Sequence, residues 1–217
     1  MSKILSKEIK KIEILISTLS GKVDDNLRKS IKSLTNNDII LANKVIKEDE
    51  NIDRMEMDIE EECLKVLALH QPVAIDLRYI IAILKINNDL ERIGDLSSNI
   101  ADITKLYSNK NTFDLPNEIV EMKDIVLEML KNSLDSFIYR DPNLAKKVQI
   151  SDDLVDDLHS KMYELVKISI KNNMEANFDF WLPMLSVSRY LERIADHCTN
   201  ISEDVEYLIT GNITRHK

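Results

Sequence analysis

An eleven-residue stretch that occurs twice constrains the fold of this chain more than any other feature. Residues 90–100 read LERIGDLSSNI and residues 191–201 read LERIADHCTNI, so seven of the eleven positions are identical. The two copies begin 101 residues apart in a chain of 217 residues. A repeat separated by nearly half of the chain length predicts that a whole structural unit is duplicated.

Each copy of the repeat carries a row of polar residues at helical spacing. The first row is Glu91, Asp95, Asn99 and Asp102, and the second row is Glu192, Asp196, Asn200 and Glu203. At about 100° per residue, each row forms a stripe roughly 80° wide on one face of a helix. On the helix of the first row, the apolar residues are centred about 160–180° away, so its acids are expected to face away from the core.

The composition favours helices over the whole length of the chain. Three Gly, four Pro and 5% aromatic residues are few for a β-rich protein, whereas 44% hydrophobic residues are enough for a sizeable core. Apolar residues spaced by threes and fours predict helices over residues 6–34, up to 69, up to 107, 117–138 and 143–170, then a loop at 172–179 and a sixth helix. The predicted fold is all-α, with two tandem antiparallel three-helix bundles related by internal duplication, in residues 1–108 and 109–217.

Charge and hydropathy exclude several classes of protein. A net charge of −9 argues against a general nucleic-acid binder, which needs a basic surface. The most apolar stretch, residues 74–86, carries Asp76, Arg78 and Lys85, so no segment is expected to span a membrane. Cys63 and Cys198 are far apart and typical of reduced core thiols. We therefore expect a soluble, cytoplasmic protein.

Two further polar rows lie on the helices that precede the repeats. The row in the first half is Asp49, Asp53, Glu56 and Glu60, and the row in the second half is Asp152, Asp156, His159 and Tyr163. If neighbouring helices bring two rows together, carboxylates and an Asn converge in each half. Such oxygen ligands suit hard or borderline cations such as Mg²⁺, Mn²⁺, Ca²⁺ or non-haem iron.

The plainer interpretation of these rows is that they are solvated helix faces. Against it, like charges at i, i+4 destabilise a helix, and the stripes contain no Lys or Arg that offsets them. Asp153 and Asp157 offer a competing register for the pair on the fifth helix. The sequence has neither a Gly-rich phosphate loop nor a nucleophile–base arrangement, so an enzyme is not expected, although paired carboxylates can act as acid and base.

The paired LERIGD and LERIAD segments, each followed by Asn-Ile, resemble the two signature helices of the PhoU family of phosphate-uptake regulators. The stretch QPVAIDLR at residues 71–78 is also similar to that family. So are the length and the duplicated three-helix layout, and the resemblance covers nearly the whole chain.

This resemblance implies a cytoplasmic, non-enzymatic accessory protein of a phosphate ABC transporter. Such a protein links the transporter's ATPase to a membrane sensor histidine kinase and represses the phosphate-starvation response when phosphate is plentiful. Some members of the family bind metal clusters through E(D)xxxD motifs, and Leu96 stands here where many members have a His after the first motif. The expected ligands, for Mg, Mn, Fe or Zn ions, are Asp49, Asp53, Glu91, Asp95, Asn99, Asp152, Asp156, Glu192, Asp196 and Asn200. We also expect a homodimer.

Two other functions stay open at this stage. One is a metal-binding or redox protein whose carboxylate clusters serve no phosphate control, and the other is a plain helical scaffold with solvated acids. Neighbouring genes for a phosphate transporter would favour the regulator. The two carboxylate sites are predicted to differ, because His159 and Tyr163 replace Glu56 and Glu60. The first half should therefore prefer Mg²⁺ or Mn²⁺, and the second half softer ions.

Overall fold

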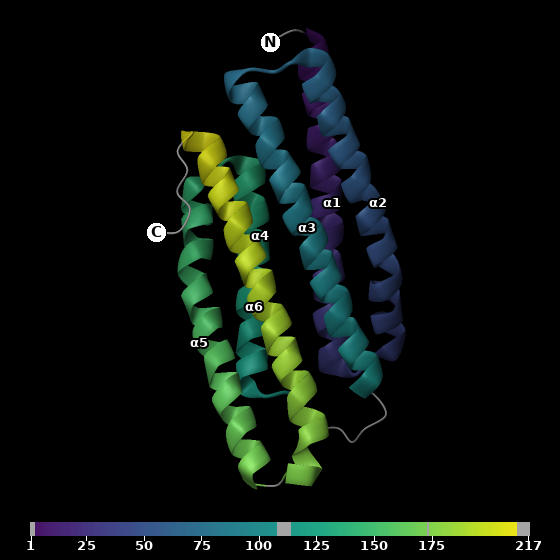
Figure 1. Ribbon diagram of the computed structural model, residues 1–217, viewed down its shortest axis with the longest axis vertical. Helices are drawn as coiled ribbons and strands as arrows, with labels where there is room; N and C mark the ends of the chain where they lie inside the picture. The colour runs from purple at the N-terminus through teal and green to yellow at the C-terminus, as the bar shows by residue number, and fades with distance from the viewer. Residues whose placement is uncertain (1–2, 108–113, 173, 212–217) are drawn as a thin grey trace.

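A computed structural model describes residues 3–107, 114–172 and 174–211, and within these ranges the chain forms six long α-helices and no strand. They are α1 (Lys3–Asn36), α2 (Ile39–His70), α3 (Ala74–Tyr107), α4 (Asn117–Tyr139), α5 (Pro142–Asn172) and α6 (Met174–Thr210). Neighbouring helices run in opposite directions, α1 to α3 form one bundle and α4 to α6 a second, and α3 lies beside α6 (Figure 1). The predicted all-α fold with two three-helix bundles is confirmed.

The predicted helix ends agree with the structure to within about three residues, except at the start of the sixth helix. The polar run at residues 172–179 was predicted to be a loop, but α6 already begins at Met174. This prediction was wrong because Met, Glu and Ala, which open that helix, are strong helix formers even where no apolar periodicity is visible. Residue 173 and the predicted boundary between residues 108 and 109 lie outside the described residues.

The duplication extends over all three helices, but with two different spacings. Val23 and Leu27 of α1 correspond to Val126 and Leu130 of α4, 103 residues later, and all four are fully buried. The same spacing of 103 relates α2 to α5, whereas α3 and α6 are related by 101. The connection between the second and third helices is therefore two residues shorter in the second half.

The two bundles share one continuous hydrophobic core, and polar contacts between α3 and α6 add to the joint. His197 Nδ1 lies 2.8 Å from Asp89 Oδ1, and Lys85 Nζ lies 2.8 Å from Asp204 Oδ1. Both aspartates are buried, and a buried carboxylate needs such partners. The joint therefore depends on specific charged pairs as well as on apolar packing.

No helix in the described ranges combines the length and the apolar character that crossing a bilayer requires. Cys63 and Cys198 are both buried and unpaired.

Candidate metal site between the second and third helices

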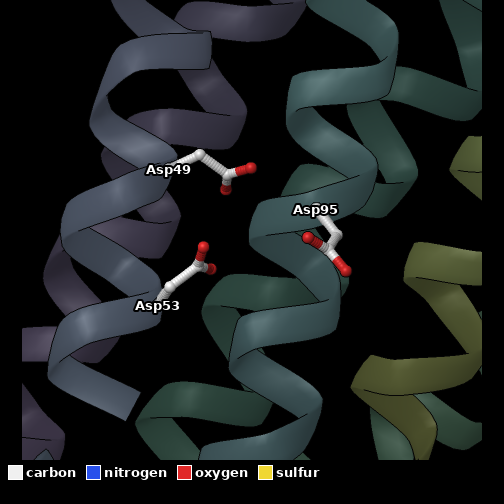
Figure 2. A group of neighbouring side chains, drawn as sticks. All are labelled: Asp49, Asp53 and Asp95. Carbon is white, nitrogen blue, oxygen red and sulfur yellow. The ribbon is translucent and has the colours of Figure 1, made fainter. Parts of the chain in front are cut away.

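Three aspartates of the first half converge between α2 and α3. Asp49 and Asp53 lie one turn apart on α2, which places both on the same face, and Asp95 faces them from α3 (Figure 2). One carboxylate oxygen from each of the three lies within 4.8 Å of the others. The structure thus brings together two of the polar rows whose convergence the sequence predicts.

Gly94 allows the two helices to approach closely at this point. A Cβ atom on Gly94 would lie 3.1 Å from Asp49 Oδ1 and 3.1 Å from Ile52 Cγ2. Contacts this short are tighter than nine in ten real Cβ contacts, so a neighbouring atom would have to move. The missing side chain therefore leaves room for the Asp49 carboxylate between the helices.

The acids are less solvent-exposed than the sequence predicts. Asp49 and Asp95 are half-buried, and Oδ1 of Asp49 and of Asp53 are shielded from solvent without accepting a hydrogen bond. On α3, Asn99 and Asp102 are exposed, as expected of a row that faces away from the core, whereas Asp95 is partly covered. A helix in a three-helix bundle has two neighbours, so its covered arc is wider than its apolar stripe. Buried carboxylate oxygens without donors require a partner, and a cation supplies one.

Burial and mutual repulsion make this group of carboxylates easier to protonate. Burial, opposed by the nearby Ser98 hydroxyl and reinforced by Asp53 and Asp95, raises the pKa of Asp49 to about 6. Burial and the Asp95 carboxylate raise the pKa of Glu91 to about 7, although Arg92 opposes the change. A bound cation would relieve the repulsion that destabilises the ionised form of each group.

Arg92 is the cation next to the group on α3. Its Nε lies 3.3 Å from Glu91 Oε2 and its Nη1 lies 3.0 Å from Asp95 Oδ2. These contacts hold Glu91 and Asp95 on the same side of the helix. Arg92 pairs with these two acids of its own helix, and Oδ1 of Asp49 and Oδ1 of Asp53 stay without a hydrogen-bond donor.

The donor set consists of carboxylate oxygens only, which fits Mg²⁺, Mn²⁺ or iron better than a sulfur-preferring metal. Asp49, Asp53 and Asp95 would hold the ion, with Glu91 nearby as a further anion. The shielded, donor-free oxygens of Asp49 and Asp53 are the observation on which this fit rests.

The corresponding acids of the second half interact but do not form an equally close group. Burial, then Asp196 and Asp156, raises the pKa of Asp152 to about 6, and burial with Asp196 raises the pKa of Glu192. In the described part of the chain, however, only the first half has three ligand atoms of His, Cys, Asp or Glu side chains within 4.8 Å. Asp156 and Asp196 are exposed.

His159 occupies the position in α5 that Glu56 occupies in α2. Its Nδ1 lies 2.9 Å from Ser188 Oγ, just as the Asn87 side chain donates to Glu56 Oε1 at 3.2 Å in the first half. Burial lowers the pKa of His159. Protonation of His159 therefore begins at a lower pH than that of an ordinary histidine, whose pKa is about 6.5.

The two asparagines of the predicted ligand set are placed differently from the aspartates. Asn99 is exposed on α3. Asn200 donates through Nδ2 to Asp89 Oδ1 at 3.3 Å, so its amide serves the joint between the bundles. The helical stripe includes Asn200, but the spacing alone does not reveal that α3 covers this side of α6.

Ser98 and Thr199 are neighbours of the carboxylates that the sequence analysis did not single out. The Ser98 hydroxyl lowers the pKa of Asp49 and the Thr199 hydroxyl lowers that of Asp152, against the larger effect of burial. Neither hydroxyl makes a hydrogen bond of regular geometry. They stand at equivalent positions of the repeat, 101 residues apart, and this correspondence was the available signal.

The sequence model of the PhoU domain matches residues 16–104 and again residues 119–205. The chain belongs to the PhoU family. It is 37% identical to the phosphate-specific transport system accessory protein PhoU homolog of Aquifex aeolicus, over 98% of this chain and 96% of that protein. The PhoU homolog 1 of Thermotoga maritima is 34% identical, over 94% of this chain and 88% of its own length.

The crystal structure of PhoU from Pseudomonas aeruginosa has the same fold. The TM-score is 0.91 at 32% sequence identity, and the match covers 95% of this chain and 99% of that chain. PhoU proteins are regulatory and accessory proteins and not enzymes, as the resemblance implied.

Proposed function

We propose that this chain is a negative regulator of phosphate uptake and of the phosphate-starvation response. The observation that carries the proposal is the match of both halves to PhoU proteins, whose names describe accessory proteins of phosphate-specific transport. Such a regulator acts as a cytoplasmic adaptor between the ATPase of a phosphate ABC transporter and a membrane sensor histidine kinase. Two bundles joined edge to edge offer one surface to each partner.

The test is deletion of the gene in its host, with a phosphate-starvation reporter measured in phosphate-rich medium. The reporter should be expressed constitutively and phosphate uptake should rise, and reintroducing the gene should reverse both changes. Unchanged reporter expression with the transporter present would refute the regulator. Co-purification of the tagged protein with the transporter ATPase and with the kinase tests the adaptor role. Light scattering of the purified protein tests the proposed homodimer.

The proposal includes a divalent metal ion held by Asp49, Asp53 and Asp95. Its support is the convergence of three carboxylate oxygens, two of them shielded from solvent without a donor. The matched experiment complements the deletion strain with a variant in which all three aspartates are replaced by Asn. Loss of repression with normal protein levels would make the metal part of the regulation.

The second candidate function is a metal-binding or redox role unrelated to phosphate control, and the same carboxylate group supports it. Full repression by the triple Asn variant, together with lost metal binding, would separate the metal site from phosphate control. The deletion experiment then decides whether the regulatory function stands by itself.

A further inference from the structure

A polar pocket lies between α1 and α2, on the face of α2 opposite the carboxylate site. It has a volume of about 360 Å³ and is lined by Asn26, Lys29, Lys44, Lys47, Glu48 and Asn51. At about 100° per residue, the α2 residues of this pocket are centred roughly 170° around the helix from Asp49 and Asp53. The pocket is therefore separate from the carboxylate site, and its ligand does not depend on the function proposed above.

Asn26 lines this pocket with a side chain that lacks hydrogen-bond partners. The residue is only 1% exposed, and neither its Nδ2 nor its Oδ1 has a partner. A buried amide that leaves both a donor and an acceptor unpaired destabilises a folded protein. The presence of Asn26 on the buried face of α1 therefore points to a ligand that both accepts and donates a hydrogen bond.

The charges around Asn26 favour an anion. Glu48 is neutralised by Lys22, whose Nζ lies 2.6 Å from Glu48 Oε1, and Lys29 is paired with Asp25. Lys44 and Lys47 form no ion pair with any described residue. The pocket thus presents uncompensated ammonium groups on a protein whose net charge is −9.

The second half has no equivalent of this pocket among its sequence positions. The residue 103 positions after Asn26 is Met129, which is 1% exposed and apolar. Lys47 and Asn51 correspond to Ile150 and Leu154. Of the basic residues only Lys44 has a basic counterpart, Lys147. Bundle packing therefore does not require a polar residue at these three positions, because the second half has apolar residues there.

We propose that this pocket binds a phosphate group that carries a hydrogen-bond donor. Monohydrogen phosphate is such a group, and so is a small phosphorylated metabolite whose hydroxyl reaches Asn26. The ammonium groups of Lys44 and Lys47 and the Asn26 Nδ2 donate to the phosphate oxygens, and the ligand's O–H donates to Asn26 Oδ1. A pocket of this size holds either ligand. Sulfate carries the same charge as monohydrogen phosphate without the proton and leaves Asn26 Oδ1 unpaired.

Calorimetric titration of the full chain with inorganic phosphate, after metal ions are removed on a chelating resin, tests this proposal. Saturable binding should weaken at least about tenfold in the Lys44→Gln/Lys47→Gln double variant, because two charge-assisted donors are lost. Both lysines are exposed, so the fold should survive their replacement, which circular dichroism checks. The matched control, Lys147→Gln in the second half, should bind phosphate like the wild type.

The Asn26→Met variant places in the first half the residue that the second half has. It should bind phosphate more weakly than the wild type and no more tightly than it binds sulfate, while its melting temperature rises. A merely structural Asn would not produce this combination. A parallel titration with glycerol phosphate distinguishes the two sources. Tighter binding than that of phosphate identifies a metabolite, and equal or weaker binding identifies free phosphate.

Either source supports the pocket. Absence of saturable binding of both compounds up to about 10 mM, or equal affinity in the wild type and the lysine double variant, would overturn the proposal. So would an equal loss in Lys147→Gln.

Discussion

The helices α2 and α5 are equivalent in the two halves, yet one face is polar on α2 and carries exposed apolar residues on α5. On α2 the face beside α1 carries Lys47 and Asn51. The corresponding residues of α5 are Ile150 and Leu154, which are 63% and 54% exposed. The buried faces of the two helices are both largely apolar. The duplication thus kept the packing surface and changed the surface around it.

This difference teaches which features the bundle needs and which are free to serve a function. Asp49 and Asp53 recur as Asp152 and Asp156, so a carboxylate pair is compatible with both halves. Asn26, by contrast, replaces an apolar residue that packs fully in the other half. A position where one copy is apolar and the other is polar and unpaired is the better indicator of a ligand, because packing does not explain it.

The largest change in the free energy of unfolding is expected from two single variants that place the residue of one half at the equivalent position of the other, Met129→Asn and Asn26→Met. Met129→Asn should lower the free energy of unfolding by about 3 kcal/mol, because it removes buried apolar surface and buries an unpaired amide. Asn26→Met should raise it by about 1 kcal/mol, because it removes such an amide. Urea unfolding of both variants measures the two changes. Destabilisation by both variants to the same extent would mean that Asn26 is as well packed as Met129.

A smaller change in the free energy of unfolding is expected when Glu91, whose pKa is raised, is replaced by Gln. Its folded-state pKa of about 7 lies above its ordinary value of 4.5, so between these pH values the folded state binds the proton more readily than the unfolded state. Stability contributed by the protonated form is therefore lost as pH rises from about 4.5 to about 7. With allowance for solvent screening, Glu91→Gln should raise the unfolding free energy of metal-free protein at pH 8 by on the order of 1 to 2 kcal/mol.

Glu192→Gln is the matched control for that change, because Glu192 stands at the equivalent position and burial raises its pKa in the same direction. Its effect at pH 8 should be smaller, and neither variant should differ from the wild type at pH 4. Thermal unfolding measured at both pH values decides the matter. A larger stabilisation at pH 8 by Glu192→Gln than by Glu91→Gln would contradict this prediction.

The sequence was sufficient to predict the fold and the helices that carry the site, because apolar periodicity and the repeat determine how helices pack. It also predicted that the row of Asp49 and Asp53 and the row of Asp95 converge if their helices are neighbours, since i, i+4 spacing places residues on one face. It did not reveal that Asn200 serves the joint between the bundles. The side of α6 that α3 covers depends on the rotation of one whole bundle against the other, which no local pattern specifies.

The pocket around Asn26 was also beyond the sequence analysis. Asn26 lies beside Leu27, and the apolar series Leu19, Val23, Leu27 and Ile31 is unbroken without it, so the helical pattern did not single it out. The correspondence with Met129 becomes visible only once the spacing of 103 is known, and the LERIGD repeat gives 101. The two-residue difference arises in the connection before the third helix, so the repeat could not align the first two helices.

Metal binding should differ between the halves by about tenfold, which corresponds to about 1.4 kcal/mol. Asp95→Asn removes a member of the close group, whereas Asp196→Asn removes an exposed carboxylate. Titration with Mg²⁺ and with Zn²⁺ by calorimetry should show loss of the tighter Mg²⁺ site only in Asp95→Asn. The Zn²⁺ affinity of the second half, which has His159, should fall more in Asp196→Asn. Equal losses of both metals in both variants would refute the difference.

The smallest effect is expected from Gly94, whose counterpart in the second half is Ala195. Gly94→Ala gains about 1 kcal/mol from helix propensity but places a Cβ 3.1 Å from Ile52 Cγ2 and from Asp49 Oδ1. The Asp49 carboxylate can shift, but Ile52 is fully buried and has no space, so the contact outweighs the gain. We expect a net loss of about 0.5 kcal/mol and a several-fold weaker Mg²⁺ affinity, because the displaced Asp49 leaves the group. Ala195→Gly, the control, should cost about 1 kcal/mol through helix propensity alone and leave Mg²⁺ binding unchanged. If Gly94→Ala instead stabilised the protein and kept its Mg²⁺ affinity, α2 and α3 could separate without cost, and the close approach at Gly94 would not be what shapes the site.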